Sequence, residues 1–368
     1  MIFKRVYVFL LAITNANIHA EISNYSKLTV LPLDSGVHFV MNNYKTASSF
    51  GAVGNGISDD TDALIKAFSS GANLDLEGKK YFIDLRRSGS EYGLIPSNNT
   101  MIEGNGAEII LKPNNLTHYS MITLAFSENV KIHNLKLTGD VRRHNAASGG
   151  EWGMGFSILG SKNCELYNVE ANEMWGDGFY VGAYGEETNE GGGIFNSSAR
   201  ANLRVGISVA RCKNFSIVNC KFTDTGTINA VPPGFGVDIE PNPYFYDSID
   251  GIKLINIVTE NNLGGGILFV PRNLEFSTNP HAKFNVYIEN FVSKSDGFKK
   301  YWLSSGLRFV EYLSENTYNG LVEIKGFDVI QPKEGVVPFR WERNDDSSLT
   351  VQATDLKVDG VSEYDYLY

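Results

Sequence analysis

A glycine followed by an apolar residue, a variable residue and a second apolar residue recurs along this chain, and few folds accommodate such a repeat. Six copies align on Gly155, Gly178, Gly206, Gly236, Gly266 and Gly306. The first apolar column contains Phe156, Phe179, Ile207, Val237, Ile267 and Leu307, and the second contains Ile158, Val181, Val209, Ile239, Phe269 and Phe309. An alternation with a period of two is the pattern of a β-strand that buries one face. We therefore expect six similar strands whose apolar columns point into a shared core.

A second repeat places asparagine at a corresponding point between these strands. Its members are Asn134, Asn168, Asn196, Asn219, Asn256 and Asn290, at intervals of 34, 28, 23, 37 and 34 residues. A minimum of 23 residues with a variable excess predicts a coil of constant circumference with loops inserted at fixed corners. Because each coil of a parallel solenoid contacts only its neighbours, we expect the asparagines of successive coils to hydrogen-bond to one another.

The stretch SSFGAVGNGISDDTDALIKAF, residues 48–68, resembles the N-terminal segment of the pectate-lyase superfamily, which includes tailspikes and other glycan-active proteins. Together with the repeats, the resemblance covers residues 46–330. It implies an all-β fold, a single-stranded right-handed parallel β-helix (a solenoid) of the pectin-lyase-like type that is related to glycoside hydrolase family 28.

The same stretch also contains a helical pattern. Leu64, Ile65 and Phe68 share one face, and Ser58 or Asp59 is the expected N-cap. We expect this N-terminal helix to cap the first coil, whose core and sheet edge are otherwise exposed.

The two ends of the chain differ from its middle. Residues 1–20 have two basic residues, a short apolar run and a final alanine, which is the build of a secretory signal peptide cleaved after Ala20. Residues 21–45 form an N-terminal extension, and residues 331–368 are expected to form the final coils or a small β cap. The apolar run is too short to span a membrane, and no later segment approaches that length. We expect a secreted, periplasmic or cell-surface protein without a membrane span.

Charge and cysteine content exclude several classes of protein. The formal net charge is −10, and it becomes −12 once Lys4 and Arg5 are removed with the signal peptide, so a nucleic-acid partner is not expected. Cys164, Cys212 and Cys220 are an odd number, which leaves at least one thiol free, and their spacing fits no zinc pattern.

The outward column of the repeat points to a functional site. Two residues after each glycine it contains Ser157, Tyr180, Ser208, Asp238, Leu268 and Arg308. Glu240 lies two residues beyond Asp238 on the same face, and residues two apart on a strand have Cα atoms ~6.6 Å apart. Arg204 lies on the preceding coil. We therefore expect Asp238 and Glu240 to be paired carboxylates on the outside of one sheet, although such a pair is also compatible with an ordinary solvated surface.

Long inserts flank this face and predict a groove. Residues 140–153 and 183–192 form two of them, and others precede Asp238 and follow Glu240. Asp177, in a Gly-Asp-Gly turn, is the third catalytic candidate. The candidates for binding substrate are Arg204, Tyr180, His144, Glu151, Trp152, Arg308 and Trp175.

Glycan cleavage is the chemistry that this set favours. An inverting glycoside hydrolase needs a carboxylic acid and a carboxylate ~6.5–9.5 Å apart, with room for water between them. Neighbours along a strand meet that distance. The expected protein is therefore an exported polysaccharide-degrading enzyme that hydrolyses glycosidic bonds with an acid pair and needs no cofactor.

Two alternatives remain at this point. A polysaccharide lyase or uronate epimerase needs a base and a cation that neutralises the uronate, with Ca²⁺ held by the acids. A non-catalytic glycan-binding protein needs only the groove. Polygalacturonases of this fold carry Asn-Thr-Asp, paired aspartates and Gly-His-Gly, and none of these motifs occurs at the corresponding strands. A wider resemblance is to exported or phage-like β-helix proteins with GEWG, GDG and GIDIEPN-like stretches.

Overall fold

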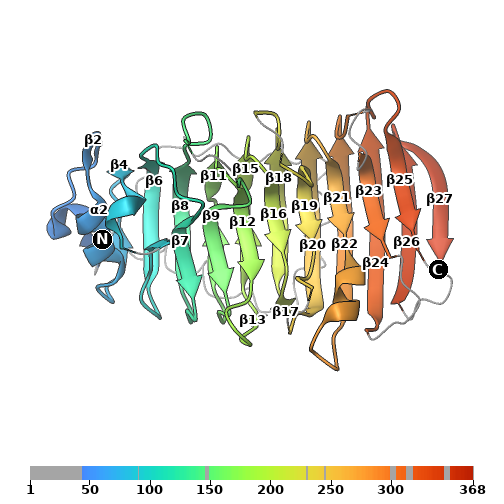
Figure 1. Ribbon diagram of the computed structural model, residues 1–368, viewed down its shortest axis with the longest axis horizontal. Helices are drawn as coiled ribbons and strands as arrows, with labels where there is room; N and C mark the ends of the chain where they lie inside the picture. The colour runs from blue at the N-terminus through green and yellow to red at the C-terminus, as the bar shows by residue number, and fades with distance from the viewer. Residues whose placement is uncertain are drawn as a thin grey trace, which may run out of the picture.

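The computed structural model describes residues 44–89, 91–145, 149–228, 231–243, 246–298, 304–311, 318–343 and 349–367. The predicted signal peptide and nearly all of the N-terminal extension lie outside these residues. The described chain coils around one long axis, with its N-terminal and C-terminal parts at opposite ends (Figure 1).

Within the described ranges, one face of the solenoid is a nine-stranded sheet. Its strands are β5 (Tyr92–Leu94), β7 (His118–Ala125), β9 (Trp152–Leu159), β12 (Asp177–Gly182), β16 (Val205–Val209), β19 (Phe235–Ile239), β21 (Gly265–Phe269), β23 (Ser305–Val310) and β25 (Val337–Glu342). Every neighbouring pair in this sheet is parallel.

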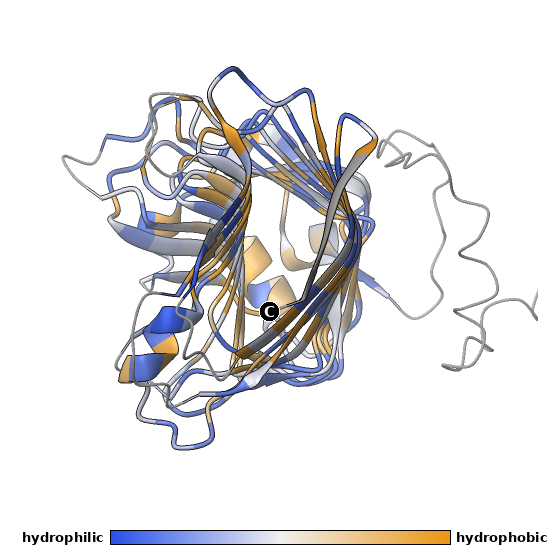
Figure 2. Ribbon diagram, turned by 90° about the vertical axis from the view of Figure 1, so that its right-hand side faces the viewer, coloured by the Kyte–Doolittle hydropathy of each residue, from blue (hydrophilic) through white to orange (hydrophobic). Residues whose placement is uncertain are grey.

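The rest of the coil wall is an eighteen-stranded sheet in the described part of the chain. Its strands are β1 (Lys45–Thr46), β2 (Asn55–Asp59), β3 (Leu74–Asp75), β4 (Lys80–Ile83), β6 (Met101–Leu111), β8 (Lys131–Thr138), β10 (Glu165–Tyr167), β11 (Glu170–Asn172), β13 (Asn189–Glu190), β14 (Gly193–Phe195), β15 (Ser198–Arg200), β17 (Cys212–Lys213), β18 (Ser216–Thr223), β20 (Ile249–Glu260), β22 (Phe284–Lys294), β24 (Gly320–Ile330), β26 (Leu349–Val358) and β27 (Val361–Leu367). β27 pairs antiparallel with β26 at the C-terminal end of the stack. Figure 2 looks along the stack of coils and shows the walls that enclose the core.

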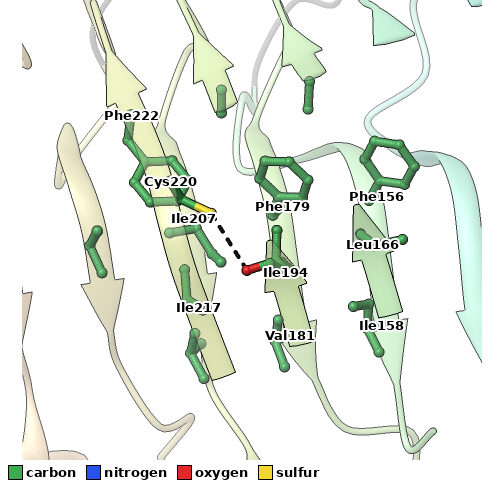
Figure 3. Packing of buried hydrophobic residues seen from close by; sticks show 14 of the residues in the cluster. Phe156, Ile158, Leu166, Phe179, Val181, Ile194, Ile207, Ile217, Cys220 and Phe222 are labelled. Carbon is green, nitrogen blue, oxygen red and sulfur yellow. Dashed lines mark hydrogen bonds between the residues drawn. The ribbon is translucent and has the colours of Figure 1, made fainter. Parts of the chain in front are cut away.

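The predicted strand alignment is confirmed by the register of the nine-stranded sheet. The first apolar column pairs in the order Phe156, Phe179, Ile207, Val237, Ile267 and Leu307. All six side chains are buried, and Figure 3 shows Phe156, Phe179 and Ile207 packed within the interior on successive coils. The rings of Phe156 and Phe179 stack with their centroids 5.5 Å apart.

Close packing explains the glycine of the repeat. A Cβ atom added at Gly206 would lie 2.5 Å from the carbonyl oxygen of Gly236 and 2.8 Å from Cβ of Phe222. Only glycine lets the coils approach this closely at that point.

The predicted asparagine ladder is present on the eighteen-stranded sheet. Asn219 donates to Asn196 at 3.0 Å, Asn256 donates to Asn219 at 2.9 Å, and Asn290 donates to Asn256 at 3.1 Å. Each of these asparagines has a positive φ of 50–56°, a conformation that asparagine tolerates better than most residues. Asparagine is therefore suited to this turn in two ways: its backbone tolerates the positive φ, and its side-chain amide hydrogen-bonds to a neighbouring coil.

Replacing Asn256 by alanine should lower the free energy of unfolding by about 2–4 kcal/mol, because two ladder hydrogen bonds are lost and alanine is strained in a left-handed turn. Asn256→Gly loses the same hydrogen bonds without the strain and should be the milder change. Chemical denaturation of both variants measures the difference, and a glycine variant less stable than the alanine variant would contradict this explanation.

The predicted helix is present as α2 (Thr61–Phe68), at the N-terminal end of the stack (Figure 1). Leu64 and Phe68 are buried in the common core. The expected N-cap was wrong: Asp60 occupies that position, and its carboxylate accepts the N–H groups of Val53 and Gly54 instead. Sealing of the first coil by α2 stays a prediction.

The other helical segments of the described residues are short 3-10 turns: η2 (Ala47–Phe50), η3 (Leu85–Arg87) and η4 (Pro271–Phe276). Across the described ranges, no helix combines the length and apolar character that crossing a membrane requires. The three cysteines are buried and unbridged, and Cys220 lies in the core beside Ile194 (Figure 3).

Candidate active site

Asp238 lies in the outward row of the nine-stranded sheet, as predicted. It pairs with Ser208 on β16 and with Leu268 on β21, and Ser208 pairs in turn with Tyr180 on β12. The side chain of Asp238 is nevertheless completely buried. Surrounding side chains cover the outer face at this point, which the alternation of residues alone does not indicate.

Arg204 is the centre of an acidic cluster on this face. Its Nη1 atom lies 3.0 Å from Oδ2 of Asp177 and 3.1 Å from Oγ of Ser208. Its Nη2 atom lies 3.7 Å from Oδ2 of Asp238 and 3.7 Å from Oε2 of Glu240. The three carboxyl groups predicted from sequence as catalytic candidates thus converge on one guanidinium group: Asp177 comes from the coil before Arg204, and Asp238 and Glu240 come from the coil after it.

Asp238 and Glu240 differ in their surroundings. Burial raises the pKa of Asp238 well above its usual range, and the charge of Glu240 and a hydrogen bond between the two carboxyl groups raise it further, while Arg204 acts in the opposite direction. The side chain of Glu240 is 34% exposed and accepts a hydrogen bond from Asn273 at 3.3 Å. Burial therefore favours the protonated form of Asp238 beside the carboxyl group of Glu240, which is the arrangement of an acid and a base in contact.

Apart from the contact between the carboxyl groups of Asp238 and Glu240, several buried atoms of this cluster have no hydrogen-bond partner within the protein. They are Oδ1 of Asp177, Nε of Arg204, and Oδ1 and Oδ2 of Asp238. Buried polar atoms are nearly always paired in native proteins, so a group of unpaired ones requires an explanation. Unsatisfied hydrogen-bonding capacity concentrated at one point is expected of a ligand site.

Asp177 is also buried, at the start of β12. Burial raises its pKa to about 6, against the opposing effects of Arg204 and Ser208. A carboxyl group with a pKa in this range changes protonation near neutral pH, so Asp177 is a second acid or base candidate across the guanidinium group from Glu240.

Asp296 is a buried aspartate of a different kind. It accepts hydrogen bonds from Thr259, Ser293 and Asn262 within the core, and neither of its oxygens is unpaired. Burial raises its pKa to about 6 although these hydrogen bonds lower it. Asp296 is thus buried like Asp238, but its hydrogen bonds are all made within the core. This makes Asp296 a suitable control for substitutions at Asp238.

The charge on Asp296 should make stability pH-dependent. Because its folded pKa of about 6 is above its ordinary value of 3.8, its contribution is fully present below about pH 4 and is lost as the pH rises through about 6, about 3 kcal/mol in total. As the pH rises from about 4 to above about 6, the free energy of unfolding of Asp296→Asn should therefore increase by roughly this amount relative to that of the wild type. Denaturant unfolding across this range measures the gain, and exposed Glu190→Gln is the control. The same dependence of the unfolding free energy on pH in wild type and Asp296→Asn would contradict this prediction.

A second network, which sequence reasoning missed, holds the segment that follows Glu240. Arg211 and Asp247 form a buried ion pair at 2.7 Å. Asp247 also accepts the backbone N–H of Asn242 at 2.7 Å, and Arg211 donates to the carbonyl oxygen of Gly185 at 2.9 Å. The pair ties the segment after Glu240 to the insert 183–192. No repeat pattern marks either residue, since both lie where the coil departs from the repeat.

The amide side chains beside Glu240 were also missed. Asn242 donates to Asp247 at 3.0 Å and to the hydroxyl of Tyr180 at 3.4 Å. Asn273 on η4 donates to the carbonyl oxygen of Pro241 at 2.9 Å as well as to Glu240. Asn242 follows Glu240 closely in sequence and was within reach of sequence reasoning, whereas Asn273 comes from a later coil and carries no signal.

Aromatic side chains extend from the cluster toward the N-terminal coils. Trp152 is 42% exposed, with its ring centroid 6.1 Å from that of Tyr180 and stacked on His118 at 6.0 Å. Glu151 is exposed beside Trp152. Partly exposed aromatic rings next to polar groups are suited to binding sugar rings. Tyr244, another aromatic residue of these inserts, lies outside the described residues.

Three predicted substrate-binding residues, His144, Trp175 and Arg308, have buried side chains. The side chain of His144 is 1% exposed, hydrogen-bonds to Asp140 at 2.9 Å, and stacks on buried Trp175 at 4.1 Å. Arg308 lies in the predicted row, but its 3% exposed side chain is held by Glu342 at 2.9 Å. These side chains are engaged in packing and ion pairs and lie outside the proposed site.

The described residues contain no group of three or more His, Cys, Asp or Glu side chains arranged to hold a metal ion.

The comparisons with known proteins agree on the fold and not on an activity. No protein-family model matches the chain. The uncharacterized protein YclG of Bacillus subtilis is 28% identical over 247 residues, 61% of this chain and 41% of that protein. The uncharacterized SPbeta prophage-derived protein YorA of the same organism is 26% identical over 161 residues, 40% of this chain and 27% of that protein. The chain therefore spans less than half the length of these curated relatives.

Two solved structures share the architecture. Pre-mature gene product 12 of bacteriophage phi29 superposes with a TM-score of 0.56 at 17% identity, over 83% of this chain and 43% of that one. The family 28 exopolygalacturonase of Yersinia enterocolitica also gives 0.56, at 12% identity, over 86% and 65%. The chain thus has the right-handed parallel β-helix fold of pectin lyase-like proteins.

Proposed function

We propose that this chain is a glycan-cleaving enzyme that hydrolyses glycosidic bonds at the Asp238–Glu240 pair. The observation that carries the proposal is the Asp238 carboxyl group, which is fully buried, has no hydrogen-bond partner other than the carboxyl group of Glu240, and lies 3.7 Å from Nη2 of Arg204. Structural buried acids of this chain, such as Asp296, are fully hydrogen-bonded. The carbohydrate-active enzyme among the proteins with this fold supports the assignment only at the level of fold.

In the proposed reaction, Asp238 donates its proton to the glycosidic oxygen while the bond between that oxygen and the anomeric carbon breaks. A water molecule adds to the anomeric carbon and gives a proton to Glu240, so that one water is consumed for each bond. The proton then returns from Glu240 to Asp238 through the contact between their carboxyl groups. Arg204 holds both acids, and Asp177 on its other side is the alternative base.

The spacing of the pair adds one requirement. An inverting pair is ~6.5–9.5 Å apart, whereas the carboxyl groups of Asp238 and Glu240 hydrogen-bond to each other. The substrate oxygen and the water must therefore replace this hydrogen bond when they enter. The partial exposure of Glu240 supports Glu240 as the side chain that moves.

A screen against acidic and neutral polysaccharides tests the proposal, with mass spectrometry of products and ultraviolet absorbance recorded in parallel. Saturated fragments that disappear with Glu240→Gln support hydrolysis by the pair. Unsaturated, absorbing fragments would instead indicate elimination, as in a lyase. Binding without any product, unchanged in the variants, would indicate a non-catalytic glycan-binding protein.

We also propose that the chain is exported, on the basis of residues 1–20. Expression in a bacterial host with secretion should yield a chain that begins at Glu21, because cleavage after Ala20 removes the apolar run. Intact-mass measurement of the secreted or periplasmic protein tests this. Retention of residues 1–20 in the folded protein would contradict export by this route.

A further inference from the structure

The acidic cluster has a charge that limits which sugars it accepts. Burial lowers the pKa of Arg204, but Asp177, Asp238, Glu240 and Glu151 together raise it above its usual range. The guanidinium group of Arg204 thus has three carboxyl groups within 3.7 Å, those of Asp177, Asp238 and Glu240, and burial favours the protonated form of Asp238. The cluster as a whole is negative.

Arg211 and Arg308, two other arginines in the described residues of this face and its inserts, are already paired with acids. Arg211 is bound to Asp247 with both side chains fully or nearly fully buried. Arg308 lies two coils beyond Asp238 and is held by Glu342. Arg204 itself contacts Asp177 at 3.0 Å and is shared with the other acids. A substrate carboxylate at this point would meet carboxylates before it met a cation.

We infer that the sugar at the cleaved bond carries no carboxylate, and that a protonated amino sugar is preferred over a neutral one. This inference rests on the proposed function, since it specifies the substrate class of the same site. It also favours hydrolysis over elimination, because negative groups stabilise the positive charge that develops on the sugar in hydrolysis. Elimination requires a cation on the uronate carboxylate, and Arg204 is already occupied by acids.

Matched monosaccharides test the inference without any need for turnover. Galactosamine, galactose and galacturonate share one ring configuration and differ in charge, and glucosamine, glucose and glucuronate form a second series. Each is titrated into the full chain while the Arg204 side-chain NMR signal and the carboxyl signals of the cluster are followed. We expect the amino sugar to bind at least about tenfold more tightly than the uronate, with a difference that decreases at high salt.

The variant Glu151→Gln, combined with Glu240→Gln, provides the control. Removing these two charges should reduce the preference for the amino sugar while the neutral sugar is less affected. Tighter binding of a uronate in either series, or no response to any amino sugar, would overturn the inference.

The experiments distinguish a wrong charge preference from a wrong assignment of hydrolysis. Cleavage that leaves a uronate at the new reducing end would refute the charge inference and leave hydrolysis standing. The expected order of binding together with no cleavage of any glycan would refute hydrolysis and leave the charge inference standing.

Discussion

Asp238→Asn is expected to lower turnover of the cognate glycan by about 10²–10⁴-fold, the range in which a positioned general acid contributes. Asparagine has nearly the shape of the protonated aspartate and can donate a hydrogen bond to Glu240, so the cluster should keep its geometry. It has no acidic proton to give to the leaving oxygen. Steady-state kinetics on the active glycan measures the loss, and circular dichroism with thermal unfolding confirms the fold.

The matched control is Asp296→Asn, which removes an equally buried acid outside the site. This variant should alter stability and its pH dependence while turnover stays within a few-fold of wild type. An Asp238→Asn variant that retains turnover close to that of Asp296→Asn would contradict the assignment of Asp238 as the acid.

Arg211→Met is expected to lower the free energy of unfolding by about 3–5 kcal/mol, the usual cost of breaking a buried ion pair by removing one partner. Asp247 would keep its position between Asn242 and the core but lose its cation. Burial already raises the pKa of Asp247, and Arg211 opposes that effect. The insert 183–192 would also lose the hydrogen bond to Gly185. Chemical denaturation at neutral pH measures the change.

The ion pair of Lys213 with Glu190 provides the contrast, because Lys213 lies two residues from Arg211 but its pair, at 3.0 Å, is exposed. Lys213→Met should change stability by less than about 1 kcal/mol. The double variant Arg211→Met with Asp247→Leu should recover most of the loss, since no buried charge remains. Equal effects of Arg211→Met and Lys213→Met would contradict a structural role for the buried pair.

The coils were predictable because their constraints are local and repeated. Each strand must present its apolar columns to the same core, so one alignment on the glycines predicts the register that pairs Ser208 with Asp238 and Leu268 with Arg308. The asparagine turns were predictable for the same reason, as identical side chains stack at one corner. Both features follow from a period that is visible in the sequence.

The candidate site was predictable only in part. The position of Asp238 beside Ser208 follows from the register, but the complete burial of Asp238 does not. The same applies to Asn273 and to the ion pair of Arg211 with Asp247, which connect segments of different coils. Exposure depends on how irregular segments pack, and alternation along a strand does not report it.

Cleavage in water enriched in the heavy oxygen isotope tests the central claim most directly. Reaction with a glycan that the screen identifies is stopped early, the new reducing ends are fixed by reduction, and the products are weighed by mass spectrometry. Hydrolysis at the Asp238–Glu240 pair predicts one heavy oxygen at each new end, in wild type and Asp296→Asn, and its loss together with activity in Asp238→Asn. Unsaturated products without the heavy isotope would contradict hydrolysis and indicate elimination.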